Sequence, residues 1–162
     1  MLAAEALRLS AMEILLPTAV QGIGPYPTLA GPRVFDSRSV PLEALDQDGP
    51  YTPVLSLYTP ESAAKLRGPH SAASDTEADA VLEIVAELAV RAVGPADPHD
   101  PDGGSIEYAD ASTSTDPKAR LVLAALCAQV RRTLERSQAG GLWRKLVRQI
   151  TNTEYKTFAV PE

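Results

Sequence analysis

The sequence predicts an α+β domain in which a small, mainly antiparallel or mixed sheet of about four strands is covered by two helices. Three observations support this class. Runs of β-branched and aromatic residues lie between Arg33 and Thr59, residues 80–92 alternate between apolar and other side chains, and two stretches carry apolar residues at helical spacing. A chain of 162 residues with 44% apolar residues fits one domain, residues 1–162, with a single core.

The first helix is expected over residues 2–16, where Pro17 stops it. We expect its broad apolar face to dock on the sheet. That face combines a stripe of four residues with four that widen it: Leu2, Leu9, Met12, Leu16, Leu7, Ala11, Ile14 and Leu15.

From Pro17 to Pro32 the glycines and prolines predict an extended arm. Its Gly-x-Gly is not a phosphate loop, because no strand precedes it and no helix follows.

Two strands are expected next, one around Val34 and Phe35 and the other over residues 52–59. The polar, turn-rich segment between them reads as a surface connection of about ten residues. Beyond Pro60 we expect a short helical turn at Glu61–Leu66 and then a mobile loop to Thr76.

Residues 80–92 are ambiguous, because their alternation predicts a strand whereas Ala, Glu and Leu favour a helix. Because the alternation holds for nine positions, we predict a strand. Residues 93–115 follow as a long, flexible loop rich in Pro, Gly and Asp. The acidic run Asp97–Asp102, with Glu107 beyond it, fits an EF-hand calcium loop poorly, because prolines interrupt it and no helix enters it.

The second helix opens at Asp116-Pro117, with Asp as N-cap and Pro at the first helical position, and stops at Gly140-Gly141. Its apolar stripe is Leu123, Leu126, Cys127, Val130 and Leu134. Cys127 therefore reads as a small core residue. Trp143 either finishes the core or anchors a subunit contact. Residues 150–160 should be extended, either as a sheet strand or as an arm that reaches a neighbour.

Charge is segregated along the chain, although the formal net charge is only −6. Between Asp75 and Asp116 acidic residues outnumber basic ones by eleven to one, and between Lys118 and Arg148 basic residues outnumber acidic ones by eight to one. Opposite charges on different faces would favour head-to-tail association of identical subunits into a ring. The alternative is that the two segments compensate each other within one monomer.

The sequence offers little support for catalysis or for a bound cofactor or metal. The two histidines, His70 and His99, lie in Pro/Gly-containing segments, and no Gly-x-Ser-x-Gly, His-Glu-x-x-His or paired-cysteine motif occurs. We therefore expect no enzyme, no catalytic residue and no cofactor.

Sequence-specific nucleic-acid binding and membrane insertion are not expected either. The chain is acidic, only 5% of its residues are aromatic, and it carries no nucleic-acid-binding signature. It has no run of about 20 apolar residues and no exportable leader. One cysteine suits a reducing cytoplasm.

The stretch from Arg33 to Thr59 resembles the tail terminator proteins of long-tailed bacteriophages and of phage-like particles such as gene transfer agents. The order is Arg-Val-Phe-x-x-Arg, then x-Pro-Leu, an acidic gap, and Pro-x-Leu-x-x-Tyr-Thr. The residues that carry it are Arg33, Val34, Phe35, Arg38, Pro41, Leu42, Pro53, Leu55, Tyr58 and Thr59.

The resemblance implies a structural virion protein that forms a ring, usually a hexamer, on the head-proximal end of the tail tube. Such a ring stops tube polymerisation and joins the tail to the head or neck. Its partners would be other copies of itself, the major tail tube protein and a head-completion or stopper protein, and DNA would pass through the lumen without sequence-specific binding. Assembly would take place in the host bacterial cytoplasm. Two features depart from the family pattern. The Pro/Gly/Asp-rich loop is long, and the chain stops at Pro161-Glu162, where a final sheet strand is expected.

Nine residues are candidates for protein interfaces, because they are basic or aromatic and belong to the C-terminal third: Arg131, Arg132, Arg136, Trp143, Arg144, Lys145, Arg148, Tyr155 and Phe158. Three other functions stay open: another head–tail connector such as a stopper or tail-completion protein, a small homo-oligomeric binding domain, and a small hydrolase.

Overall fold

The computed structural model describes residues 2–38, 51–66, 76–93, 106–109, 117–136, 141–154 and 156. Within them the elements follow in the order α1 (Leu2–Leu15), the 3-10 helix η1 (Thr18–Val20), β1 (Val34–Asp36), β2 (Tyr51–Leu66), β3 (Thr76–Val93), β4 (Ile106–Ala109), α2 (Pro117–Arg136) and α3 (Gly141–Leu146). The expected α+β class with a mixed sheet is confirmed.

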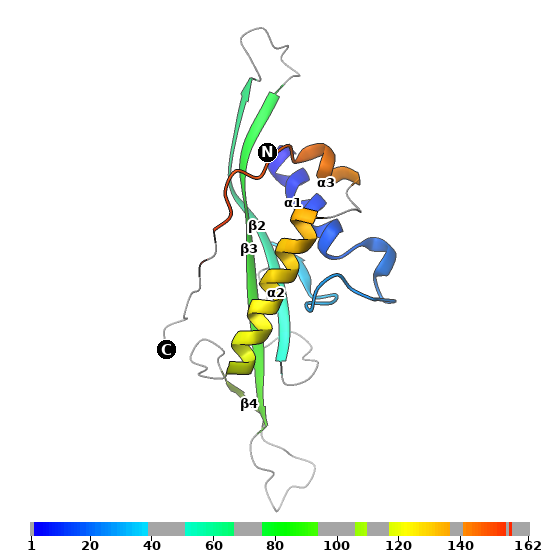
Figure 1. Ribbon diagram of the computed structural model, residues 1–162, viewed down its shortest axis with the longest axis vertical. Helices are drawn as coiled ribbons and strands as arrows, with labels where there is room; N and C mark the ends of the chain where they lie inside the picture. The colour runs from blue at the N-terminus through cyan, green and yellow to red at the C-terminus, as the bar shows by residue number, and fades with distance from the viewer. Residues whose placement is uncertain are drawn as a thin grey trace, which may run out of the picture.

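The sheet is built on one long antiparallel hairpin, β2–β3, that runs most of the length of the molecule (Figure 1). The strand order is β1-β2-β3-β4. β1 pairs parallel to the middle of β2, and β4 pairs antiparallel to the last residues of β3. An extra residue in β2 shifts the hairpin register between Tyr58 and Glu61, which marks a β-bulge.

The core lies between one face of the sheet and the helices. Val34, Leu55 and Leu57 share this face, since β1 pairs with β2 through Val34 and Leu55. They pack in one cluster with residues from all three α-helices: Ala11, Ile14 and Leu15 of α1, Leu126 and Val130 of α2, and Trp143 of α3. The helices therefore cover the same side of the sheet (Figure 1).

The helical part differs from the expectation of two helices, because Gly141–Leu146 forms a third one, α3. Trp143 anchors it: the indole is buried, and its Nε1 donates a hydrogen bond to the carbonyl of Leu134 at 3.2 Å. That carbonyl is in the last turn of α2, where no intrahelical donor is left. In α1, Leu9 was expected on the core stripe but is 54% exposed, so this assignment was wrong.

The strands also run further than expected. Residues 80–92 form a strand, as the alternation predicted, and β3 extends this strand at both ends. The helical turn at Glu61–Leu66 was wrong, because these residues pair in register with Val81–Thr76 and continue β2. Cross-strand pairing overrides the helical propensity of Ala63 and Ala64 here. The loop expected over 93–115 was wrong at Ile106–Ala109, which pairs with Val90–Val93; its other residues beyond Val93 lie outside the described part.

Two further segments, one near each end of the chain, also differ from the expectation. Pro17–Pro32 is not the extended arm that was expected, because it holds η1 and several turns, and Gly22, Gly24 and Gly31 have positive φ angles that reverse the chain. The amide of Leu29 donates to Oε1 of Gln129 at 2.8 Å, which ties the segment to α2. At the other end, residues 150–154 belong to no strand, so the sheet-strand alternative was wrong for them.

Candidate interaction surfaces

The outer part of the hairpin forms an arm, which we define as Glu61–Leu66 of β2 and Thr76–Val81 of β3, and its tip extends past the helices (Figure 1). Side chains from Glu61 to Ala64 and from Ala78 to Val81 are exposed. In the covered part of the same hairpin, by contrast, Thr52–Leu57 are all buried. Both faces of the arm are therefore accessible for contact with another molecule.

The two faces of the arm differ in chemistry. Residues opposite each other in an antiparallel pair point to the same side, so the register puts Glu61 with Val81 and Ala63 with Asp79 on one face. Glu77 continues this acidic face, where Lys65 is its partner in the register. The other face carries small side chains, Ser62 with Ala80 and Ala64 with Ala78.

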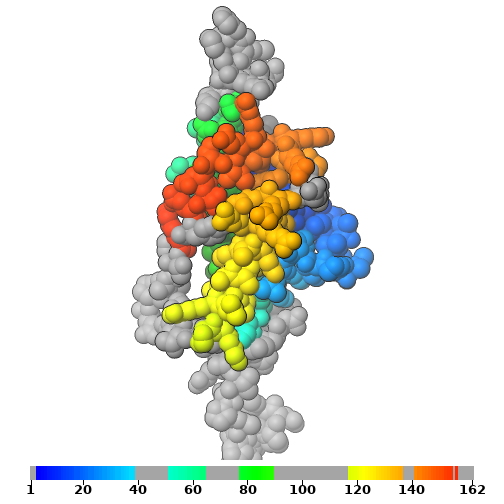
Figure 2. Space-filling model, viewed as in Figure 1, coloured from blue at the N-terminus to red at the C-terminus, as the bar shows by residue number. Residues whose placement is uncertain are grey.

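A second exposed surface is formed by α3 and the residues that follow it. We call it the α3 surface; it consists of Leu142, Arg144, Lys145, Leu146, Arg148 and Ile150, all exposed. The three apolar side chains are 57%, 43% and 46% exposed. Their spacing of four residues is the signal in the sequence that could have found them. In Figure 2, α3 and the following segment lie beside the C-terminal end of α2.

An open hollow of about 310 Å³ borders the α3 surface. Leu134, Trp143, Val147 and Ile150 contribute apolar lining, while Glu135, Arg144, Arg148 and Gln149 contribute polar lining. Leu134 and Trp143 also belong to the packed interior or its margin. The hollow is thus a shallow site for an apolar group flanked by mostly positive charge.

The candidate interface residues of α2 are exposed and partly paired. Arg131 Nε lies 2.9 Å from Oε1 of Glu135, one turn further along the helix, and Arg132 and Arg136 are also exposed. Arg148 Nη1 lies 3.6 Å from Oε1 of Glu77 on the arm. This ion pair links the acidic and basic segments within the monomer.

Trp143, also an interface candidate, is only 7% exposed and packs in the core, where it anchors α3 to the other helices. Arg144 and Lys145, its neighbours, are exposed. Tyr155 and Phe158 lie outside the described residues.

The face of the sheet away from the helices carries a polar cluster around Arg38. Its Nε donates to Oγ of Ser56 at 3.2 Å, its guanidinium forms an ion pair with Glu87, and its carbonyl accepts from the hydroxyl of Tyr58 at 3.2 Å. Nearby, Arg33 Nε donates to the carbonyl of Pro53 at 3.2 Å.

On the helix side, Arg8 of α1 forms an ion pair with Asp36 of β1, and its Nη1 donates to Oγ1 of Thr59 at 2.9 Å. Thr59 is one of the residues that carry the resemblance described above, and most of the others also lie at the β1–β2 junction. In this molecule they hold β1, and Arg38 two residues beyond its end, onto β2. Pro41 and Leu42 lie outside the described residues.

Catalytic chemistry finds little support in the described residues. They contain no group of three or more His, Cys, Asp or Glu side chains placed to hold a metal ion. Burial raises the pKa of the Cys127 thiol above its ordinary value, which disfavours the reactive thiolate. His70, His99 and the acidic run 97–102 lie outside the described part. Among the described helices, none is long and apolar enough to cross a membrane.

Comparison with known proteins gives no relative: no protein-family model, no curated protein and no solved structure matches this chain.

Proposed function

We propose that this protein is a tail terminator: copies of it form a ring, hexameric by analogy with the resembled family, on the head-proximal end of a phage or phage-like tail tube. The ring stops tube growth and offers the head-side proteins a surface for joining. DNA passes through its lumen without sequence-specific contacts. The particle is assembled in the host cytoplasm and carries the ring in its neck.

The observation that carries this proposal is the arm. A two-stranded ribbon with both faces open to water buries little apolar area, so a partner that covers it would stabilise it. The arm also has two unlike faces, and the α3 surface is different again. Unlike surfaces that bind each other give head-to-tail contacts, and such contacts close into rings when the rotation between subunits permits.

A terminator must bind the last tube ring on one side and refuse another tube subunit on the other. A small α+β domain whose helices cover one face of the sheet has two different sides for this purpose. The polar cluster at Arg38 and the pair between Arg8 and Asp36 stabilise the sheet to which the arm is joined.

The test is the mass and placement of the purified full chain. Light scattering after size exclusion should give a mass near six copies, either alone or after mixing with tail tube protein. Electron microscopy should then find extra density at one tube end only, and tubes polymerised in its presence should be shorter. A protein that stays monomeric with tube protein and leaves tube length unchanged would refute the proposal.

Another connector role, as a stopper or tail-completion protein, makes a different prediction in the same experiment. Such a protein would form an oligomer but would not shorten growing tubes. A stand-alone oligomeric binding domain would also leave tube length unchanged, and it would not bind the tube end.

A further inference from the structure

We propose that the acidic face of the arm of one copy binds the α3 surface of the next copy, and that this contact joins neighbouring subunits. The inference rests on the proposed self-association and assigns the two surfaces that make it.

Charge complementarity identifies the partner of the arm. Glu61, Glu77 and Asp79 lie on its acidic face, with Glu83 next along β3 on the same side. The α3 surface presents Arg144, Lys145 and Arg148; Glu135 lines the neighbouring hollow, and Glu77 of the same chain lies 3.6 Å from Arg148. Surfaces of opposite charge steer association and fix its register.

The apolar parts also match. Leu142, Leu146 and Ile150 are large exposed apolar groups set among the basic residues, a combination typical of interaction sites. Val81, 49% exposed, and Ala63 lie among the carboxylates of the arm. Six residues per strand give the arm a length of about 20 Å, enough to lie along a short helix and the residues after it.

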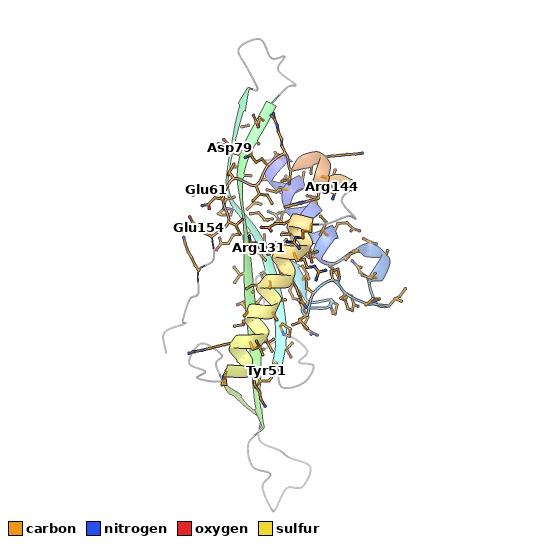
Figure 3. The ribbon with its side chains drawn as sticks, in the orientation of Figure 1. Tyr51, Glu61, Asp79, Arg131, Arg144 and Glu154 are labelled. Carbon is orange, nitrogen blue, oxygen red and sulfur yellow. The ribbon has the colours of Figure 1, made fainter. Side chains whose placement is uncertain are left out.

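Within one chain an ion pair between Glu77 and Arg148, both solvent-accessible, links the two surfaces. In Figure 3, Glu61 and Asp79 lie on one side of the hairpin and Arg144 lies on the other. A monomer therefore cannot bring Arg144 to these two carboxylates, whereas a head-to-tail neighbour can. This arrangement favours an open, heterologous contact over internal compensation.

The experiment uses single charge reversals in the full chain. Glu61→Lys alters the acidic face and Arg144→Glu alters the α3 surface; both residues are exposed. Glu5→Lys and Arg120→Glu are matched controls, because they make the same changes in net charge at exposed positions of α1 and α2. Sedimentation equilibrium, in the presence of tail tube protein if this is needed for assembly, measures self-association, and urea unfolding confirms that each variant folds.

Each reversal should weaken self-association at least about 10-fold, since like charges then face each other, while the controls change it less than about 2-fold. An equimolar mixture of Glu61→Lys and Arg144→Glu should recover assembly, because every lysine then meets a glutamate of the other variant. The Glu61→Lys/Arg144→Glu double variant should assemble with itself.

Assembly of the unaltered protein without any effect of the two reversals would overturn this inference and leave the terminator proposal intact. Loss of assembly without recovery in the mixture would also overturn it, because it would mean that the residues do not meet. If the unaltered protein fails to assemble even on tubes, the terminator proposal fails together with the inference.

Discussion

Arg38 brings a positive charge to the sheet face away from the helices, where its side chain is only 9% exposed. Such a charge is costly unless it is paired and hydrogen-bonded. Glu87 supplies the opposite charge and Ser56 an acceptor. β3 places Glu87 opposite Val54, beside Ser56 of β2, so the pairing of the two strands supplies groups that offset this cost.

The first prediction tests this dependence. Glu87→Gln should lower the free energy of unfolding by about 1–3 kcal/mol, because a partly buried guanidinium loses its counter-charge. Glu83→Gln is the matched control, since Glu83 occupies an exposed position on the same face of β3, and it should change the free energy by less than about 0.5 kcal/mol. Urea denaturation measures both; equal losses would mean that the ion pair does not stabilise the fold.

The second prediction concerns Cys127, whose pKa is raised because burial disfavours the thiolate. Its labelling by a disulfide reagent at pH 8 should be several-fold slower than that of a free thiol, and the rate should keep rising at pH values where a free thiol has levelled off. The raised pKa contributes stability that is complete below the pKa of the unfolded chain and is lost as pH rises through the pKa of the folded one. Cys127→Ser should remove that part of the alkaline loss of stability, and an identical loss in both proteins would contradict the assignment.

At the scale of elements, β2 and β3 pass from a covered region into the arm without a break in pairing apart from the bulge. Residues Val54–Leu57 are buried, with Leu55 and Leu57 facing the helices, whereas Ser62–Ala64 are exposed. One hairpin therefore contains two regions of different local stability, because the energy of opening a segment depends on the apolar area that it buries.

The third prediction follows from this difference. In the monomer, amide hydrogens that pair Ser62–Ala64 with Ala78–Ala80 should exchange at least about 10-fold faster than those that pair Val54–Leu57 with Ile84–Glu87. In the assembled form the arm should gain protection, since a neighbour covers it, while the covered region stays the same. Hydrogen exchange followed by mass spectrometry measures both; an arm already as protected as the covered region in the monomer would contradict this view.

The elements that the sequence predicts are those whose local pattern agrees with their packing. Pro117 opens α2, the alternation of residues 80–92 marks β3, and the stripe through Leu126 and Val130 is buried. Local patterns did not predict the secondary structure of segments whose conformation depends on contacts with residues far away in the sequence. Glu61–Leu66 is a strand only because β3 lies beside it, and α3 forms because its Trp143 reaches the end of α2.

At the scale of the whole molecule, the charge segregation of the sequence becomes a spatial arrangement that the sequence could not give. The acidic residues of β3 share the face of the hairpin that points away from the helices, and Glu77 meets Arg148 only after the chain has folded. The basic candidates of α2 and α3 were predictable as exposed cations. Leu142, Leu146 and Ile150 were not recognised, because their four-residue spacing does not by itself tell an exposed apolar set from a buried one.

The fourth prediction concerns the forces that hold copies together. Raising NaCl from 0.1 to 1 M shortens the screening length from about 10 to about 3 Å. If carboxylates of the arm face the cations of the α3 surface, the association constant should fall at least about 10-fold over this range. In the Glu61→Gln/Arg144→Gln variant the fall should be much smaller, since the charges that salt would screen are absent, although the apolar contacts of Leu142 and Leu146 remain. Sedimentation equilibrium at several salt concentrations measures both slopes. If the unaltered protein associates equally strongly, or more strongly, in 1 M NaCl, apolar contact alone holds the copies together. The surface to examine would then be the face of the arm with small side chains: Ser62, Ala64, Ala78 and Ala80.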